Sequence, residues 1–242
     1  LAMLHDLKQA GYTVDKIPQS PRELLDLIER GNTSLDLGTY RNMFDSLPAT
    51  TREAIEAAWG SARIGARSSN SDTPISPSPR AEGKGQSTFP FRAATFGNIT
   101  VALAPDRGRS ADRRADYHDP TLPPRHELVA FGLWLQKSIG AHAIVHVGAH
   151  GTLEWLPGKT VALSESCFPE IVTGSLPVIY PFIVSNPGEA AQAKRRIAAV
   201  TLGHLPPPLT EAGLDANQQK LERLVDEYAQ ADGLDRRRRD RL

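Results

Sequence analysis

The feature that most constrains the fold is an alternation of short apolar runs with helical patterns. The runs at residues 98–104, 143–147 and 177–184 are rich in Val and Ile, as buried strands are. Helical patterns lie between and after these runs. Because parallel strands need long crossover connections, which are usually helical, this order predicts an α/β fold. We expect a parallel or mostly parallel sheet with helices on both faces, as part of a larger multidomain chain.

The three runs are expected to occupy different positions. Residues 98–104 are interpreted as a buried strand, and residues 143–147 as a central strand. Pro181 lies inside the run at 177–184. Because proline cannot donate a backbone hydrogen bond, this run is expected to be an edge strand or to end early.

The best-marked helix begins near Ser20. Ser20 can cap it, Pro21 fits its first position, and Glu23 completes a capping box. Hydrophobic spacing and end signals predict the remaining elements. These are a helix before Gly11, a short strand at 12–14, and helices at 50–59, 124–140, 186 to about 202, and 217–231.

Composition divides the chain into four parts. Residues 61–86 consist largely of Ser, Pro, Gly and Arg, which bury too little apolar surface to offset the entropy of ordering. We therefore expect a mobile loop or linker there. The four parts are a helix-rich α/β segment at 1–60, the loop or linker at 61–90, an α/β core segment at 91–214, and a C-terminal helix with a basic tail at 215–242.

Charge and cysteine content exclude several classes of protein. The chain has 28 Lys+Arg and 28 Asp+Glu, so no overall affinity for nucleic acid follows. The arginine run at 236–239 lacks interleaved aromatic residues, and we expect a solvated tail. A single cysteine, Cys167, excludes an internal disulfide and favours a cytoplasmic location; we expect it to be structural. No run of about 18 apolar residues is present, so no membrane association is expected.

The stretch at 145–159, VHVGAHGTLEWLPGK, carries the strongest chemical signal. His146, His150 and Glu154 are residue types that bind cobalt or zinc, or that move protons near neutral pH. In open α/β sheets, ligands bind at the carboxyl ends of strands, where this stretch is placed. The alternative is that His146 is a core histidine and His150 only shapes a turn.

Residues 107–126 form a second cluster, rich in arginine, aspartate and histidine. Its arginines can bind substrate carboxylates bidentately. Asp116, His118 and Asp119 can act as metal ligands or bases. The alternative is a solvated charged loop.

A third cluster, NPGEAAQAKRR, spans residues 186–196. The start of this predicted helix offers free N–H groups that can bind an anion. Lys194 and Arg196 lie at the edges of the inner helical face. We interpret Glu189 as a capping residue rather than a ligand.

Together, the long motifs resemble the CobN/magnesium chelatase family, which includes the large subunit of aerobic cobaltochelatase. The resemblance rests on HVGAHGTLEWLPGK at 146–159, YPFIVSNPGEAAQAKRR at 180–196 and GHLPPPLTEAGL at 203–214. FGNITVALAPDRG at 96–108 and YHDPTLPP at 117–124 fit the same family in the same order. The resemblance implies a central fragment of a much longer subunit, with residues 61–86 as a lineage-specific insertion.

This resemblance implies an enzyme that inserts Co²⁺ into a corrin ring, hydrogenobyrinic acid a,c-diamide, in aerobic cobalamin biosynthesis. An AAA+ ATPase subunit and its companion subunit would hydrolyse ATP with Mg²⁺, and this sequence shows no P-loop of its own. The isolated fragment is expected to be inactive. The alternatives are the porphyrin-binding subunit of magnesium chelatase, or a non-catalytic module that binds tetrapyrrole or a partner. The segment PGEAAQAKRR favours cobalt, as does the better fit of cobalt to imidazole ligands.

The chemical steps of metal insertion indicate which roles the candidate residues would have. Two pyrrolic protons must leave and the hydrated metal must lose water, which suits His and Glu. We expect catalytic roles for His146, His150 and Glu154, and metal coordination by these three with Asp116. The expected substrate-binding residues are Arg107, Arg109, Tyr117, His118, Lys159, Lys194 and Arg196.

Overall fold

The computed structural model describes residues 1–62, 88–108, 116, 119–148, 151–161, 163–181, 187–203 and 215–231. Two compact units are present, Leu1–His204 and Leu205–Leu242. Most of the expected loop at 61–86 lies outside the described residues. Among the described residues, no helix is both long and apolar enough to cross a membrane.

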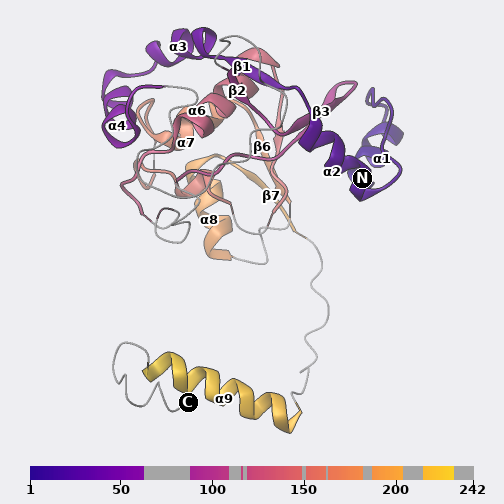
Figure 1. Cartoon of the computed structure of the whole chain (residues 1–242), viewed down its shortest axis with the longest axis vertical. Helices are drawn as coiled ribbons and strands as arrows, with labels where there is room; N and C mark the ends of the chain where they lie inside the picture. The colour runs from indigo at the N-terminus through magenta and orange to yellow at the C-terminus, as the bar shows by residue number, and fades with distance from the viewer. Residues whose placement is uncertain are drawn as a thin grey trace. The chain divides into compact units, whose positions relative to one another are not determined.

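The elements of the first unit alternate between helices and short strands (Figure 1). Its helices are α1 (Ala2–Gln9), α2 (Pro21–Arg30), α3 (Leu37–Asp45), α4 (Ala49–Trp59), α6 (His126–Leu133), α7 (Phe168–Thr173) and α8 (Pro187–Arg196). Its strands are β1 (Ser34–Asp36), β2 (Thr88–Pro90), β3 (Ala93–Phe96), β4 (Ile99–Ala102), β5 (Ile144–Val145), β6 (Val178–Pro181) and β7 (Val200–Leu202). The second unit contains α9 (Ala216–Ala231).

The described strands form three sheets. β1 pairs with β2, and β3 pairs with β4, both antiparallel. β5, β6 and β7 form a parallel sheet in that order, with Ile144 opposite Val178 and Ile179 opposite Val200. The predicted α/β class with a parallel sheet is therefore confirmed. Its parallel part is confined to three short strands.

The run predicted to be a central strand lies at an edge: it supplies β5, an edge strand of the described sheet. The run at 177–184, predicted to be an edge strand or to end early, supplies the central strand β6, which ends at Pro181. The edge position is therefore wrong for this run, and the early end is the alternative that agrees with the structure. Pro181 is the last residue of β6, opposite Leu202. Proline is tolerated there because no further ladder bond from its own nitrogen is needed at the end of a strand.

The apolar run at 98–104, expected to be a buried strand, lies outside the parallel sheet. It supplies β4, which forms a half-buried antiparallel hairpin with β3 rather than a buried parallel strand. Gly97 turns the hairpin with a φ of 62°, a value that favours glycine. Residues 12–14, expected as a strand, form none, and Val14 instead packs with Leu4 and Phe96 in a small apolar cluster.

The helix predictions are more accurate because their end signals are local. Ser20 Oγ accepts from Glu23 N–H (3.1 Å), which is the predicted cap of α2. Helices α4 and α9 lie where expected, and α6 continues into a π-helix at Trp134–Ser138. α8 ends at Arg196, not near Leu202, because Ala198 adopts a φ of 48° and the chain then enters β7.

The main core joins two parts that the sequence separated. Leu35, Tyr40 and Ile55 belong to the same buried cluster as Leu128 and Val178. Residues of 1–60 and of 91–204 therefore belong to one compact unit. Helix α3 contacts α6, and helix α2 contacts β3. The sequence did not predict α3, α7 or strands β1 to β3.

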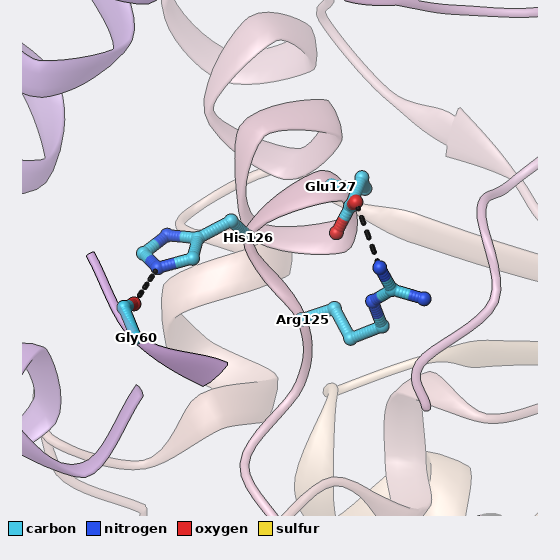
Figure 2. A network of polar contacts seen from close by, with 4 residues as sticks. All are labelled: Gly60, Arg125, His126 and Glu127. Atoms are coloured by element: carbon cyan, nitrogen blue, oxygen red, sulfur yellow. Dashed lines mark hydrogen bonds and ion pairs between the residues drawn. The ribbon is translucent and has the colours of Figure 1, made fainter. Parts of the chain in front are cut away.

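A buried histidine holds part of this core together. Tyr40 O–H contacts His126 Nδ1 at 2.7 Å, and His126 Nε2 lies 2.9 Å from the Gly60 carbonyl oxygen. Because a carbonyl only accepts, His126 Nε2 carries the proton and Nδ1 accepts from Tyr40. Figure 2 shows the bond to Gly60, beside the ion pair of Arg125 with Glu127 (3.1 Å). The network connects α3, the end of α4 and the start of α6.

Candidate functional site

The candidate site begins where β5 ends. His146 follows β5, and its backbone N–H donates to the Ile179 carbonyl oxygen (2.8 Å). This bond fixes His146 beside β6, where its ring lies 4.5 Å from the Tyr180 ring, centroid to centroid. Burial lowers the pKa of His146, which favours the neutral imidazole. The two side chains therefore meet at the carboxyl ends of adjacent parallel strands.

Residues 151–159, here called the Glu154 loop, contain a 3₁₀-helix at Leu153–Trp155. Its central residue, Glu154, has an exposed fraction of 0%. Within the described structure, neither carboxylate oxygen has a hydrogen-bond partner. Burial raises the pKa of Glu154 to about 7; the nearby carboxyl group of Glu189 acts in the same direction, whereas the backbone amides of Glu154 and Gly151 oppose the shift. A carboxyl group with this pKa can both accept and release a proton near neutral pH.

Gly151 lies directly against this carboxylate. A Cβ atom at position 151 would lie 2.7 and 2.8 Å from the two Glu154 oxygens and 2.5 Å from the Tyr180 hydroxyl. Tyr180 is also fully buried, and its hydroxyl has no hydrogen-bond partner among the described residues. Because Gly151 has no side chain, the Glu154 carboxylate and the Tyr180 hydroxyl both face the position that a Cβ of residue 151 would occupy.

Glu189 is connected to this site through Trp155. The Trp155 indole N–H donates to Glu189 Oε2 at 2.8 Å. Glu189 lies in the first turn of α8, so the contact links that helix to the Glu154 loop. The sequence interpretation as a capping residue did not foresee this contact with Trp155.

Two buried arginines hold the Glu154 loop by its backbone. Arg196 donates through Nη1 to the Glu154 carbonyl oxygen (2.6 Å) and through Nε to that of Lys159 (3.1 Å). Arg107, with an exposed fraction of 1%, donates through Nη1 to the Trp155 carbonyl oxygen (3.1 Å). Its Nη2 donates to two carbonyl oxygens further along the second cluster, those of Asp119 (2.7 Å) and Leu122 (3.2 Å). Both guanidinium groups therefore bind protein backbone.

Two of the remaining substrate-binding candidates, both lysines, lie among the described residues. Lys159, in the Glu154 loop, and Lys194, in the last turn of α8, are exposed. Arg109, Tyr117 and His118 lie outside the described residues. The lysines are therefore the described candidates whose ammonium groups are accessible to an anionic substrate.

The metal-ligand candidates are only partly described. His150 lies outside the described residues. Asp116 is buried next to Gly108, where a Cβ would meet its carboxylate. Across the described part of the chain, no three or more His, Cys, Asp or Glu side chains gather closely enough to hold a metal ion. Among the described candidates, His146 and Glu154 both lie near Tyr180.

The contacts of Cys167 indicate a structural role. Its buried Sγ accepts from the backbone N–H groups of Lys159 and Ser164, each at 3.4 Å. Burial acts to raise the pKa of this thiol, but these hydrogen bonds outweigh burial and hold the pKa below its ordinary value. The sulfur therefore supports the end of the Glu154 loop.

Sequence reasoning missed Tyr180 and Gly151. Tyr180 was counted only as an apolar strand residue, since nothing in a strand pattern shows whether a hydroxyl is satisfied. Gly151 carried a visible signal, because a glycine between His150 and Glu154 marks a close approach of the backbone. The partner in that approach is 29 residues further along the chain and cannot be found from local sequence.

Comparison with known proteins agrees with the motifs. The family described as CobN/Magnesium Chelatase matches residues 1–242. An aerobic cobaltochelatase subunit CobN from Sinorhizobium sp is 40% identical over 98% of this chain and 18% of its own length. The corresponding subunit from Pseudomonas aeruginosa is 41% identical over 100% of this chain and 19% of its own length.

More distant relatives and a solved structure extend the comparison. A magnesium-chelatase subunit from Rhodobacter capsulatus is 34% identical over 88% of this chain and 17% of its own length. The catalytic subunit of cobaltochelatase from Mycobacterium tuberculosis superposes with a TM-score of 0.68 and 36% identity, covering 99% of this chain and 20% of that structure. The chain spans about a fifth of the length of these relatives. Its sequence and structure show that it belongs to the CobN/magnesium chelatase family.

Proposed function

We propose that this chain is a central part of the large subunit of an ATP-dependent cobaltochelatase. The complete enzyme inserts Co²⁺ into hydrogenobyrinic acid a,c-diamide in the cytoplasm, during aerobic cobalamin biosynthesis. An AAA+ ATPase subunit and its companion hydrolyse ATP with Mg²⁺. The proposal is supported by the two cobaltochelatase relatives, which are 40% and 41% identical, against 34% for the magnesium-chelatase relative.

The observation that carries the chemistry is the buried Glu154 carboxyl group. Metal insertion must remove two protons from ring nitrogens, and a base with a pKa near the working pH is effective in this role. Glu154 has a pKa of about 7 and no hydrogen-bond partner among the described residues. In its charged form it accepts a ring proton, and in its neutral form it passes that proton on.

Two pairs of basic residues have distinct roles in this proposal. The exposed Lys159 and Lys194 bind carboxylates at the edge of the macrocycle. Arg107 and Arg196 act indirectly, because their guanidinium groups hold the Glu154 loop. We therefore propose a positioning role for these two residues instead of direct substrate binding.

Some roles rest on the sequence alone. His146 and His150 are proposed to assist proton transfer, and transient coordination of Co²⁺ by His146, His150, Glu154 and Asp116 stays a prediction. Substrate binding by Arg109, Tyr117 and His118 also stays a prediction.

The test is Glu154→Gln in the full-length subunit, assembled with its partner subunits. Glutamine keeps the shape of the side chain but cannot accept the ring proton. Co²⁺ insertion is expected to fall by about 10²-fold or more, as expected for loss of a positioned general base, with little change in corrin affinity. The exposed Glu165→Gln is the matched control. Full turnover by a folded Glu154→Gln enzyme would refute the proposed role.

The same assay separates the alternative functions. Parallel reactions with Mg²⁺ and a porphyrin test the magnesium chelatase alternative, which the 34% identical relative keeps open. A non-catalytic binding module predicts that Glu154→Gln and His150→Ala change substrate affinity and thermal stability together, with unchanged turnover at saturating corrin.

A further inference from the structure

We propose that Tyr180 is a positioning residue for Glu154, whose phenolic hydroxyl donates a hydrogen bond to the Glu154 carboxylate while that carboxylate accepts a proton from the substrate. The inference rests on the proposed function of Glu154 and assigns that site a second residue.

The first argument is the convergence of two buried groups without partners. The Tyr180 hydroxyl and both Glu154 oxygens lie within 2.5 to 2.8 Å of the position that a Cβ of residue 151 would occupy. Both residues have an exposed fraction of 0%, and none of these three oxygens has a partner among the described residues. Buried polar groups are seldom left unpaired, so such atoms indicate a bond made in another state of the site.

The second argument is chemical complementarity. A phenol keeps its proton near neutral pH, so the Tyr180 hydroxyl can donate a hydrogen bond. A carboxylate is an acceptor, and a hydrogen bond to a charged acceptor is stronger than one between neutral groups. The Tyr180 hydroxyl and the Glu154 carboxylate are therefore a matched donor and acceptor.

The third argument is that both groups are attached to fixed backbone. Tyr180 belongs to the central strand β6, and its ring packs against His146. Arg196 binds the carbonyl oxygen of Glu154 itself, and Arg107 binds that of Trp155. The backbone on both sides is therefore held in place, and Gly151 has no side chain between the two groups.

The experiment is Tyr180→Phe in the full-length subunit within the complete chelatase. Phenylalanine keeps the ring that packs on His146 and removes only the hydroxyl. We expect kcat to fall by about 10-fold, the scale of one lost hydrogen bond to a charged group, with KM for the corrin unchanged. Tyr40→Phe is the matched control, since Tyr40 is equally buried but bonds His126; it is expected to leave kcat and KM unchanged.

A double-mutant cycle separates this inference from the proposed function. In the Glu154→Gln background, Tyr180→Phe should change kcat by less than about twofold, because residues that act as a unit are not additive. Unchanged kcat in Tyr180→Phe, or an equal loss in both backgrounds, would overturn the positioning role while leaving Glu154 as the base. Unchanged activity in Glu154→Gln would instead overturn the proposed function.

Gly151→Ala provides a second variant in case Tyr180→Phe does not fold. The added methyl group would occupy the position between the hydroxyl and the carboxylate. We expect the same loss of kcat as in Tyr180→Phe, with KM unchanged. Normal kcat in a folded Gly151→Ala enzyme would contradict the hydrogen bond.

Discussion

Two fully buried tyrosines differ in what their hydroxyl groups contact. The Tyr40 hydroxyl donates to His126. His126 in turn donates to the Gly60 carbonyl oxygen (Figure 2). The Tyr180 hydroxyl faces Glu154 across Gly151, and neither side chain has a hydrogen-bond partner in the described structure. Each tyrosine also packs against a histidine ring, His126 or His146. A satisfied network stabilises the fold, whereas unpaired buried groups reduce stability and indicate a functional site.

The largest expected effect is a loss of activity without a loss of stability when Glu154 is replaced. Glu154→Gln should lower Co²⁺ insertion by about 10²-fold or more, yet leave the unfolding free energy unchanged or higher, because a neutral amide is less costly to bury than a carboxylate. Turnover and thermal unfolding are measured on one preparation. A loss of stability comparable to that of a core mutation would show that Glu154 is a structural residue. The site around Glu154 and Tyr180 would then not differ in function from the network around Tyr40.

The next effect concerns the arginine that holds the Glu154 loop. Arg196→Met removes donors to the carbonyl oxygens of Glu154 and Lys159. We expect about a 10-fold loss of insertion and a destabilisation of about 2 kcal/mol, or roughly 4–8 °C in Tm. The neighbouring Arg195→Met is the matched control because Arg195 is exposed. Equal behaviour of the two variants would argue against the positioning role.

A smaller effect, on stability alone, is expected at the satisfied network. Tyr40→Phe leaves the Nδ1 atom of His126 without its donor, so we expect a loss of about 1–2 kcal/mol and a Tm lower by roughly 2–8 °C. Insertion per folded molecule should remain at the wild-type rate. Calorimetry and turnover together test this. A kcat loss like that of Tyr180→Phe would show that the two tyrosines are not functionally distinct.

The smallest effect is a dependence of stability on pH. Burial lowers the pKa of His126, while hydrogen bonding to Gly60 and the charges of Glu127 and Glu56 oppose burial and Arg125 supports it. The unfolded chain therefore binds more protons than the folded one, so stability rises with pH. It should fall as pH drops below about 6.5, the ordinary pKa of histidine. His126→Gln should show a shallower slope of Tm against pH, and an unchanged slope would exclude this contribution.

Local signals predicted the elements whose ends they mark. The Ser20 cap, the helix at Ala49–Trp59 and the helix at Ala216–Ala231 were found from capping, proline and spacing patterns. The order of strands was not, because pairing between distant segments places β5, expected to be central, at an edge of the described sheet and β6 at its centre. Strands of two to four residues are also too short for a period-2 pattern to predict reliably.

By itself, the sequence determined the family and the α/β class, because these follow from contiguous motifs and local spacing. Only the tertiary structure decided which buried polar groups are satisfied. Arg107 and Arg196 were expected to bind substrate, yet they bind the backbone of the Glu154 loop from distant segments. Tyr180 entered the site for the same physical reason: whether a buried donor finds an acceptor depends on packing between residues far apart in the chain.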